Sequence, residues 1–356
     1  MKKKSLMVLI CLILLFSTIG MLTACKKEPT KQEMKIVYLG DSIAEAILGP
    51  APLSEREDYG YYGLLGQTNN YIFINRAVSG HQTKNMIDFL TVKPGEGEDP
   101  EKIILKTDDD AYLTSTHLKT ANIIHISILG NDLLQAGDMF DTIILGAATG
   151  DNSYVDGILK GSYEKFSKIV KILRMYNPTA TIFFQNVYNP VYPNSELLKA
   201  EVRDELAKLN VSESQYRELG YGILSKLNAV IDKYFTEYKP QNMYLIDTYS
   251  EFKRIDDEDA TRGARLIFTD GVHPSNEGHA VIYDLNQAKF EELGLSDKNV
   301  ALNNYKNIRI RQLNTLYKTT TVDIVATTNQ ISAATSGKEI TKIYFAAIYG
   351  VLPVYC

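Results

Sequence analysis

The sequence predicts an α/β protein, with a three-layer α/β/α sandwich built around a central parallel sheet. Short β-branched or apolar runs alternate along the chain with longer stretches whose apolar residues recur at helical spacing. Strands that alternate with helices pair in parallel, because each helix carries the chain back to the same end of the sheet. With 45% hydrophobic and 23% charged residues, the composition is that of a globular protein and excludes a disordered or collagen-like chain.

Five strands are predicted from their composition and their boundaries. The first, Lys35–Leu39, is a β-branched run that ends at Gly40 and reads as a buried strand. Four later runs of the same kind are predicted to join it in the sheet: Tyr71–Asn75, Asn122–Leu129, Thr179–Val187 and Met243–Ile246.

Helices are predicted between and after these strands, from amphipathic stretches at Tyr61–Thr68, Leu133–Ala148, Tyr163–Tyr176, Leu197–Leu209 and Glu213–Tyr238. A further helix is expected at Asn299–Tyr317, whereas Thr319–Ser336 carries no clear pattern. No interior linker divides the body, so residues 35–317 are interpreted as one domain and 318–356 as an extension. Its apolar part, Ile343–Val354, is too short to span a bilayer and is expected to dock on the domain.

The N-terminus differs from this body. Lys2, Lys3 and Lys4 precede an apolar run, Leu6–Leu22, that closes with small residues before a cysteine, an order typical of an export signal. The alternative is an uncleaved membrane helix, because the run is at the lower limit of spanning length.

Leu22-Thr23-Ala24-Cys25 also resembles the lipobox of bacterial lipoproteins. The resemblance implies that residues 1–24 are a signal peptide and that a lipidated Cys25 becomes the N-terminus on the outer face of the bacterial cell membrane. Residues 25–34 then form a tether that reaches at most about 30 Å. We therefore expect the body to stay close to the membrane.

Charge and missing motifs exclude several functions. The formal net charge is −5 and no Lys/Arg cluster follows the N-terminus, which disfavours a nucleic-acid partner. The sequence has no Walker-type loop, dinucleotide glycine fingerprint, His-Glu-x-x-His or Cys-x-x-Cys motif. We therefore expect neither a cofactor nor a metal. The oligomeric state is not predicted.

Four polar blocks carry the candidate chemistry. Three stand at the ends of predicted strands: Gly40-Asp41-Ser42, Asn75-Arg76-Ala77-Val78-Ser79-Gly80 and Gly130-Asn131-Asp132; the fourth is Asp270-Gly271-Val272-His273. The carboxyl ends of parallel strands meet at one edge of a sheet, so the first three blocks are expected to lie together. A serine nucleophile needs a base and a carboxylate that orients the base, which Ser42, His273 and Asp270 supply. The backbone N–H groups of Ser42 and Gly80, with the Asn131 amide, supply donors for an oxyanion.

Taken singly, each block also fits a turn or a helix cap. In this order, however, the four blocks resemble the SGNH (GDSL-type) hydrolase family from Lys35 to about Gly294. The resemblance implies a flavodoxin-like α/β/α fold and hydrolysis of carboxylic esters through an acyl-enzyme. It puts the nucleophile at Ser42, the oxyanion donors at Ser42, Gly80 and Asn131, and the acid and base at Asp270 and His273. Ile43 stands where the family name has leucine.

Other residues are secondary candidates. Asp41, His81, Tyr188 and Tyr192 are candidates for lining the pocket, the tyrosines because Tyr188–Pro193 combines rigid prolines with amphipathic rings. Among the remaining polar residues, His125 is predicted to pack in the core, His117 and His279 to be structural, and Asp108–Asp110 and Asp256–Asp259 to be solvated loops. The segment from Leu197 to about Leu219 is either a lid or an ordinary crossover helix.

The sequence therefore predicts a surface-tethered serine esterase with a lipase- or lysophospholipase-like ester substrate. The first alternative is an O-acetylesterase acting on cell-wall glycans or polymers, which needs the same triad. The second is a surface-binding lipoprotein without catalytic activity. The sequence does not separate the two esterase functions, because loops set the dimensions of the pocket.

Overall fold

The computed structural model describes residues 33–47, 53–91, 108–134, 139–193, 195, 197–315 and 322–349. The predicted signal peptide, Cys25, most of the tether and residues 350–356 lie outside the described residues. All elements below belong to the unit Met34–Cys356.

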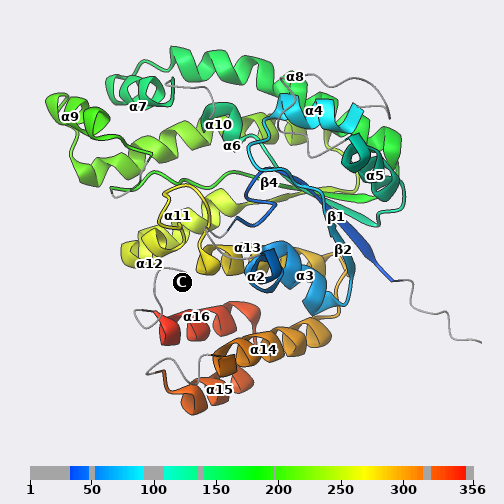
Figure 1. Ribbon diagram of the computed structural model, residues 1–356. Helices are drawn as coiled ribbons and strands as arrows, with labels where there is room; N and C mark the ends of the chain where they lie inside the picture. The colour runs from blue at the N-terminus through cyan, green and yellow to red at the C-terminus, as the bar shows by residue number, and fades with distance from the viewer. Residues whose placement is uncertain are drawn as a thin grey trace, which may run out of the picture. The chain divides into compact units, whose positions relative to one another are not determined.

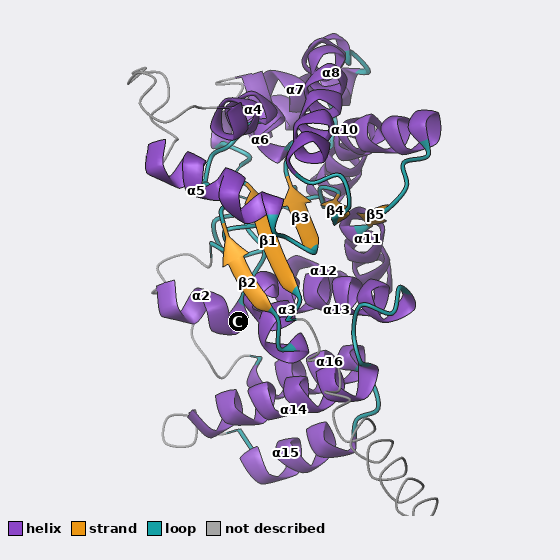
Figure 2. Cartoon of the chain, turned by 90° about the vertical axis from the view of Figure 1, so that its right-hand side faces the viewer, coloured by secondary structure: helices purple, strands orange, loops and turns teal. Residues whose placement is uncertain are grey.

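A five-stranded parallel sheet forms the centre of the fold, as predicted. The strands are β1 (Lys35–Gly40), β2 (Ile72–Asn75), β3 (Ile123–Ser127), β4 (Thr181–Gln185) and β5 (Met243–Ile246), in the order β2-β1-β3-β4-β5 (Figure 2). The predicted third strand was too long, because Leu129 has φ 97° and leaves the extended conformation.

Helices cover both faces of the sheet, which confirms the three-layer architecture (Figure 1). One side carries α4 (Thr83–Thr91), α5 (Asp108–Lys119), α6 (Gly130–Leu134), α7 (Met139–Thr149), α8 (Ser153–Tyr176), α9 (Ala200–Lys208), η2 (Glu213–Gln215) and α10 (Tyr216–Tyr238). The other carries α2 (Leu53–Tyr59), α3 (Tyr61–Asn69), α11 (Thr248–Glu258), α12 (Ala260–Arg265) and α13 (Asn276–Glu292).

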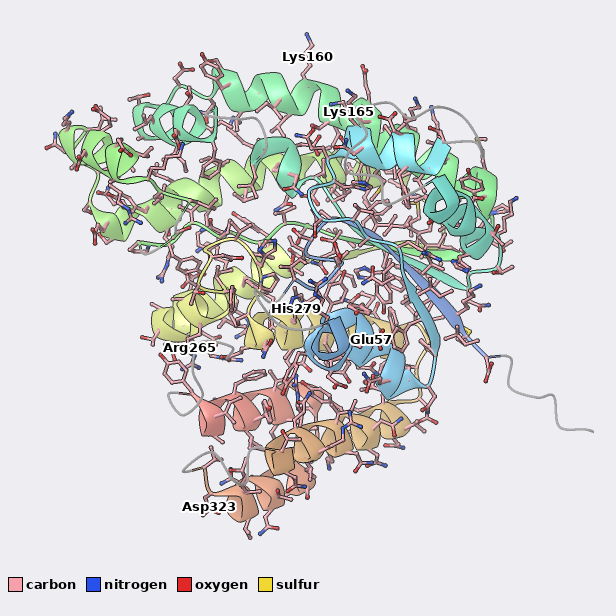
Figure 3. The ribbon with its side chains drawn as sticks, in the orientation of Figure 1. Glu57, Lys160, Lys165, Arg265, His279 and Asp323 are labelled. Carbon is pink, nitrogen blue, oxygen red and sulfur yellow. The ribbon has the colours of Figure 1, made fainter. Side chains whose placement is uncertain are left out.

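The alternation of side chains along the strands divides the core in two. In β3, Ile124 and Ile126 pack with the α8 side, whereas Ile123 packs with the α3 side. His125 is fully buried there and its Nε2 lies 2.9 Å from Asn286 Oδ1. Burial lowers the pKa of His125 to about 3, so it is a neutral core histidine, as predicted. His279 is also fully buried. Figure 3 shows it inside the domain, whereas the exposed Lys160 points outward from α8.

Two local predictions, both of solvated loops, were wrong. Asp108–Asp110 begins α5 instead of forming a loop. The described residues of the helix predicted at Leu133–Ala148 belong to α6 and α7. Asp256 is buried in α11, where its Oδ2 lies 3.0 Å from Arg217 Nε, because this cation compensates the buried charge. Asp259 accepts hydrogen bonds from the N–H groups at the start of α12 and so serves as its N-cap.

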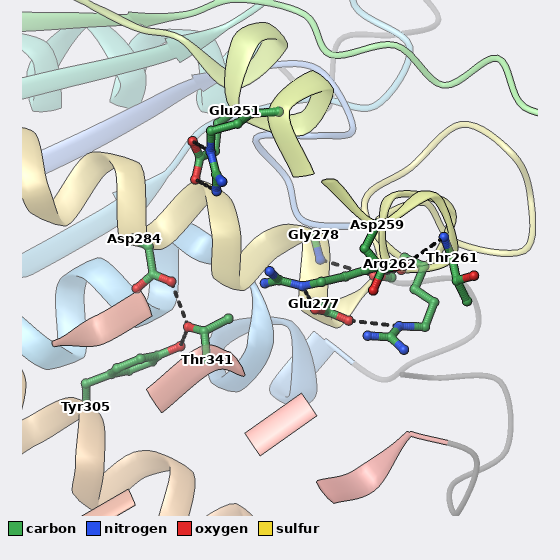
Figure 4. A network of polar contacts seen from close by, with 12 residues as sticks. Glu251, Asp259, Thr261, Arg262, Glu277, Gly278, Asp284, Tyr305 and Thr341 are labelled. Atoms are coloured by element: carbon green, nitrogen blue, oxygen red, sulfur yellow. Dashed lines mark hydrogen bonds and ion pairs between the residues drawn. The ribbon is translucent and has the colours of Figure 1, made fainter. Parts of the chain in front are cut away.

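The C-terminal helices α14 (Lys298–Thr315), α15 (Ile324–Ala333) and α16 (Gly337–Ile348) form a further layer beside α3 and α13 (Figure 1). Thr341 Oγ1 joins α16 to the domain, since it lies 2.7 Å from Asp284 Oδ2 on α13 and 2.8 Å from Tyr305 Oη on α14 (Figure 4). Tyr344, Phe345 and other apolar side chains of α16 are buried. No helix among the described residues is long and apolar enough to cross a bilayer.

Asp284 makes the stability of this layer depend on pH. Burial raises the pKa of Asp284 to about 7, although Thr341 and Arg309 oppose the shift. Between pH of about 4 and 7 the folded protein therefore keeps a proton that the unfolded chain has lost. We expect the free energy of unfolding of the wild type to fall across this range relative to that of Asp284→Asn. Urea unfolding of both proteins at several pH values measures the difference, and equal slopes would contradict it.

Candidate active site

The block Gly40-Asp41-Ser42 is positioned by the close approach of the ends of β1 and β3. A Cβ atom at Gly40 would lie 2.0 Å from the carbonyl oxygen of Ser127, so only glycine fits at the end of β1. The next residue, Asp41, donates its backbone N–H to the same Ser127 oxygen at 3.1 Å. This contact holds the turn after β1 against the end of β3, and the half-buried Ser42 stands at the carboxyl edge of the sheet.

Asp270 and His273 lie in a tight loop between α12 and α13. Ile267 and Pro274 form an antiparallel bridge, and the N–H of Phe268 donates to the His273 carbonyl at 2.7 Å. Because the two strands of the loop are joined in this way, the side chains of Asp270 and His273 are held close together.

Ion pairs tie the two ends of this loop together (Figure 4). Glu277, at the start of α13, is 3% exposed and receives Arg262 Nε at 2.8 Å and Arg265 Nε at 3.3 Å from α12. Ser275 Oγ caps α13 by accepting the N–H of Gly278. These charge-assisted bonds and the cap hold α12 and α13, the two helices that flank the loop, against each other.

The serine, histidine and aspartate form one continuous chain of hydrogen bonds. Ser42 Oγ lies 2.8 Å from His273 Nε2, and His273 Nδ1 lies 2.5 Å from Asp270 Oδ2. Asp270 Oδ1 accepts the backbone N–H groups of Val272 at 2.9 Å and His273 at 3.0 Å. Burial alone would raise the pKa of Asp270, but these hydrogen bonds outweigh it and hold the pKa below its usual value. Asp270 is therefore an anion that can stabilise a positive charge on His273.

The oxyanion candidates lie beside Ser42. Gly80 has φ 81°, a left-handed conformation that suits glycine, and both Gly80 and Asn131 line the same cleft as Ser42 and His273. The Asn131 Nδ2 donates to the His81 carbonyl at 3.2 Å, which fixes the orientation of the amide. An amide nitrogen carries a second N–H, so one donor is left for a ligand.

Two acidic residues to which the sequence analysis gave no role hold the loops of the oxyanion candidates. Glu45 Oε2 accepts the backbone N–H of Ser79 at 2.8 Å and its Oγ at 2.6 Å, immediately before Gly80. Asp132 accepts the N–H of Thr83 at 2.9 Å and its Oγ1 at 2.6 Å. The sequence placed Glu45 near the Ser42 block and Asp132 inside the Asn131 block, but it did not indicate their partners.

The active-site cleft is the cleft lined by Ser42, Gly80, Asn131 and His273. Its volume, bounded by described residues, is about 350 Å³. Its wall is partly apolar, with Ile47, Leu134, Leu197 and Val272 around the polar groups. Leu197 belongs to the segment from Leu197 to about Leu219, for which the sequence left a lid and a crossover helix open. The helix α9 of this segment packs against α7. In the described part of the chain, no group of three or more His, Cys, Asp or Glu side chains could hold a metal ion.

The secondary candidates have separate locations. Asp41 and Tyr188 line a narrow pocket next to Ser42, and burial raises the pKa of Asp41 to about 7. Tyr192 instead lines another cavity of about 600 Å³, whose wall includes Gly271 but not Ser42. The ring of His81 is buried against Phe89, with centroids 5.6 Å apart, and is not part of the described cleft wall, because its loop turns the ring inward. His81 contributes its carbonyl to Asn131 instead.

One family model matches most of the chain. The model of the GDSL-like lipase/acylhydrolase family matches residues 36–286. No curated protein matches the chain.

Similar solved structures include two Streptomyces enzymes and a metagenomic lipase. An extracellular lipase from Streptomyces rimosus is 16% identical with a TM-score of 0.49, over 72% of this chain and 99% of that chain. Phospholipase A1 from Streptomyces albidoflavus is 18% identical with a TM-score of 0.47, over 72% and 99%. A lipase from a goat rumen metagenome is 19% identical with a TM-score of 0.43, over 72% and 96%.

Proposed function

The chain belongs to the GDSL-like lipase/acylhydrolase family and is a carboxylic ester hydrolase, and on this premise we propose that Ser42, His273 and Asp270 are its catalytic triad. The observation that carries the proposal is the hydrogen-bond chain from Asp270 through His273 to Ser42 Oγ. Folding brings Ser42 to the Asp270–His273 pair, 231 positions from His273 in the sequence, and a serine nucleophile requires a base and an orienting carboxylate in this arrangement.

The reaction proceeds in two steps. Ser42 Oγ attacks the ester carbonyl while His273 Nε2 takes its proton, and the oxyanion forms against the N–H groups of Ser42 and Gly80 and the Asn131 amide. His273 then gives the proton to the leaving alcohol, which leaves the acyl group on Ser42. Water, deprotonated by His273, then attacks the acyl carbon; the bond from this carbon to Ser42 Oγ breaks, the carboxylic acid leaves, and His273 returns the proton to Ser42. Asp270 keeps Nδ1–H directed at its own oxygen throughout.

Labelling with a fluorophosphonate probe tests the activated serine directly. The wild type should be labelled at Ser42, because His273 raises the nucleophilicity of its hydroxyl, and Ser42→Ala should not be labelled. A wild type that is neither labelled nor able to hydrolyse any ester would support the alternative of a surface-binding lipoprotein without catalysis.

Asn131→Ala is expected to lower kcat about 10²- to 10³-fold, because the amide stabilises charge that develops only in the transition state. KM should change much less. Kinetics with 4-nitrophenyl acetate measure both constants, and thermal unfolding checks that the variant is folded. A large rise in KM with kcat preserved would show that Asn131 binds the substrate in its ground state.

The proposal includes attachment of the enzyme to the outer face of the bacterial cell membrane through a lipid on Cys25. It is supported by the basic start, the apolar run and the lipobox-like Leu22–Cys25. A diacylglyceryl group carries two chains at about 0.8 kcal/mol per buried CH₂, enough for stable anchoring. The tether then leaves the site near both lipid esters and cell-wall esters.

We expect metabolic labelling with palmitate in the wild type and none in Cys25→Ser, since this variant lacks the thiol that is acylated. A protein that starts at Lys26 should be fully active in solution, because Ser42 is the first catalytic residue. Release of unlabelled wild type into the medium would contradict the lipid anchor and leave ordinary export.

A further inference from the structure

Two pockets of very different size flank Ser42. The active-site cleft, about 350 Å³, is lined by His273, Gly80 and Leu197 among others. On the other side lies a pocket of only about 20 Å³, whose walls include Gly130, Leu134, Val187, Tyr188, Pro190 and Val272. Ser42, Asn131, Leu134 and Val272 line both, so the two pockets meet at Ser42 and offer separate spaces for the two halves of an ester bound there.

The position of His273 decides which half enters which pocket. This histidine must give a proton to the leaving alcohol, so the alcohol oxygen has to lie within hydrogen-bond reach of Nε2. His273 lines the large cleft and not the small pocket. The alcohol therefore leaves through the large cleft. With the carbonyl oxygen directed at Gly80 and Asn131, the small pocket is the space that remains for the acyl substituent.

We propose that the small pocket between Gly130, Val187 and Tyr188 is the acyl pocket, and that it restricts the enzyme to acetyl esters of larger alcohols. The proposal rests on the catalytic role of Ser42 and His273 given above. A volume of about 20 Å³ holds one water molecule, and a methyl group is of similar size. Each further methylene of the acyl chain has to displace a wall atom or stay outside the pocket, and overpacking of this kind is unfavourable.

The walls of this pocket are fixed on two sides. The backbone N–H and carbonyl of Val187 are both bonded to the side-chain amide of Asn228 on α10, at 2.9 and 2.8 Å. The ring of Tyr188 stacks on Phe252 with centroids 4.7 Å apart, and its Oη donates to the Val272 carbonyl at 2.7 Å. Val187, Asn228, Tyr188 and Phe252 are buried, so widening the pocket on these sides requires breaking core contacts.

The acyl series of 4-nitrophenyl esters tests the assignment. We expect kcat/KM to fall about tenfold or more for each methylene beyond acetate, from propionate to butyrate and octanoate. An octanoate ester hydrolysed as fast as acetate would overturn the acyl pocket and favour lipid esters. Hydrolysis of acetate by Ser42→Ala at more than about a tenth of the wild-type rate would instead overturn the proposed triad, so the two failures are distinguishable.

Two substitutions change the pocket in opposite directions. Val187→Ala removes wall atoms and should raise the butyrate-to-acetate ratio of kcat/KM at least tenfold. Gly130→Ala should lower the propionate-to-acetate ratio about tenfold. A Cβ there would lie 3.7 Å from Val187 Cγ1 and 3.9 Å from Asp41 Oδ2, in ordinary contact, so it fills the pocket without a clash.

Val230→Ala is the matched control, because Val230 is a buried valine of α10 outside both pockets. It loses the same atoms from the core and should leave every acyl ratio unchanged. The ratios are internal to each protein, so a smaller folded fraction of Val187→Ala does not affect them. Wild-type ratios in Val187→Ala, or equal shifts in Val230→Ala, would overturn the assignment.

Discussion

Ser42→Ala is expected to lower kcat for 4-nitrophenyl acetate by about 10⁴-fold or more, because the variant has no oxygen that can form the acyl-enzyme. His273→Ala should cost as much, since Ser42 Oγ then has no base within the 2.8 Å that now separates it from Nε2. The residual rate comes from the oxyanion donors, which both variants keep.

Non-additivity provides the sharper test of the same assignment. When two residues act in one chemical step, replacing either one removes most of their joint effect on kcat. The Ser42→Ala, His273→Ala double variant should therefore be no slower than either single variant. Ser42→Ala should unfold at nearly the wild-type temperature, because Ser42 contributes only its hydroxyl to the half-buried turn. A folded Ser42→Ala protein with more than about a tenth of the wild-type kcat would show that another residue is the nucleophile.

The sequence predicted the parallel sheet and the residues at its carboxyl edge for a physical reason. Strand composition and the boundary at Gly40 are local signals, and parallel pairing follows from the alternation of strands and helices. Ser42, Gly80 and Asn131 lie in the loops that follow β1, β2 and β3, so the edge of the sheet brings them near one another. His273 needed the family resemblance, because the short hairpin that holds it has no strand before it.

Glu45 and Asp132 were not predictable in the same way. An acidic side chain next to a turn is solvated by default, and its partner is defined only after folding. Glu45 bonds Ser79, 34 positions later, and Asp132 bonds Thr83 on a preceding helix. The volume of the acyl pocket was not predictable either, because it depends on how Val187 and Tyr188 pack against α10 and α11. Periodicity locates the strand before them but does not give the distance between their side chains.

Asp270→Asn is the second substitution with a large expected effect, about 10⁴-fold in kcat. Asp270 Oδ1 already accepts two backbone N–H groups, so an asparagine would keep its oxygen there and direct its NH₂ group at His273 Nδ1. A donor in this position favours the tautomer with the proton on Nε2. His273 could then no longer accept the proton of Ser42, and the positive charge that forms on the ring would lose its carboxylate.

Asp259→Asn is the matched control for this substitution. Asp259 is also a carboxylate that accepts two backbone N–H groups, at the start of α12, but it has no histidine partner. It should change stability by no more than a lost N-cap charge and leave kcat unchanged. For Asp270→Asn we expect a lower kcat with KM nearly constant, because the tautomer affects the chemical step and not substrate binding. If Asp270→Asn instead kept kcat and lost only stability, Asp270 would be a structural residue of the loop, and His273 would act with Ser42 alone.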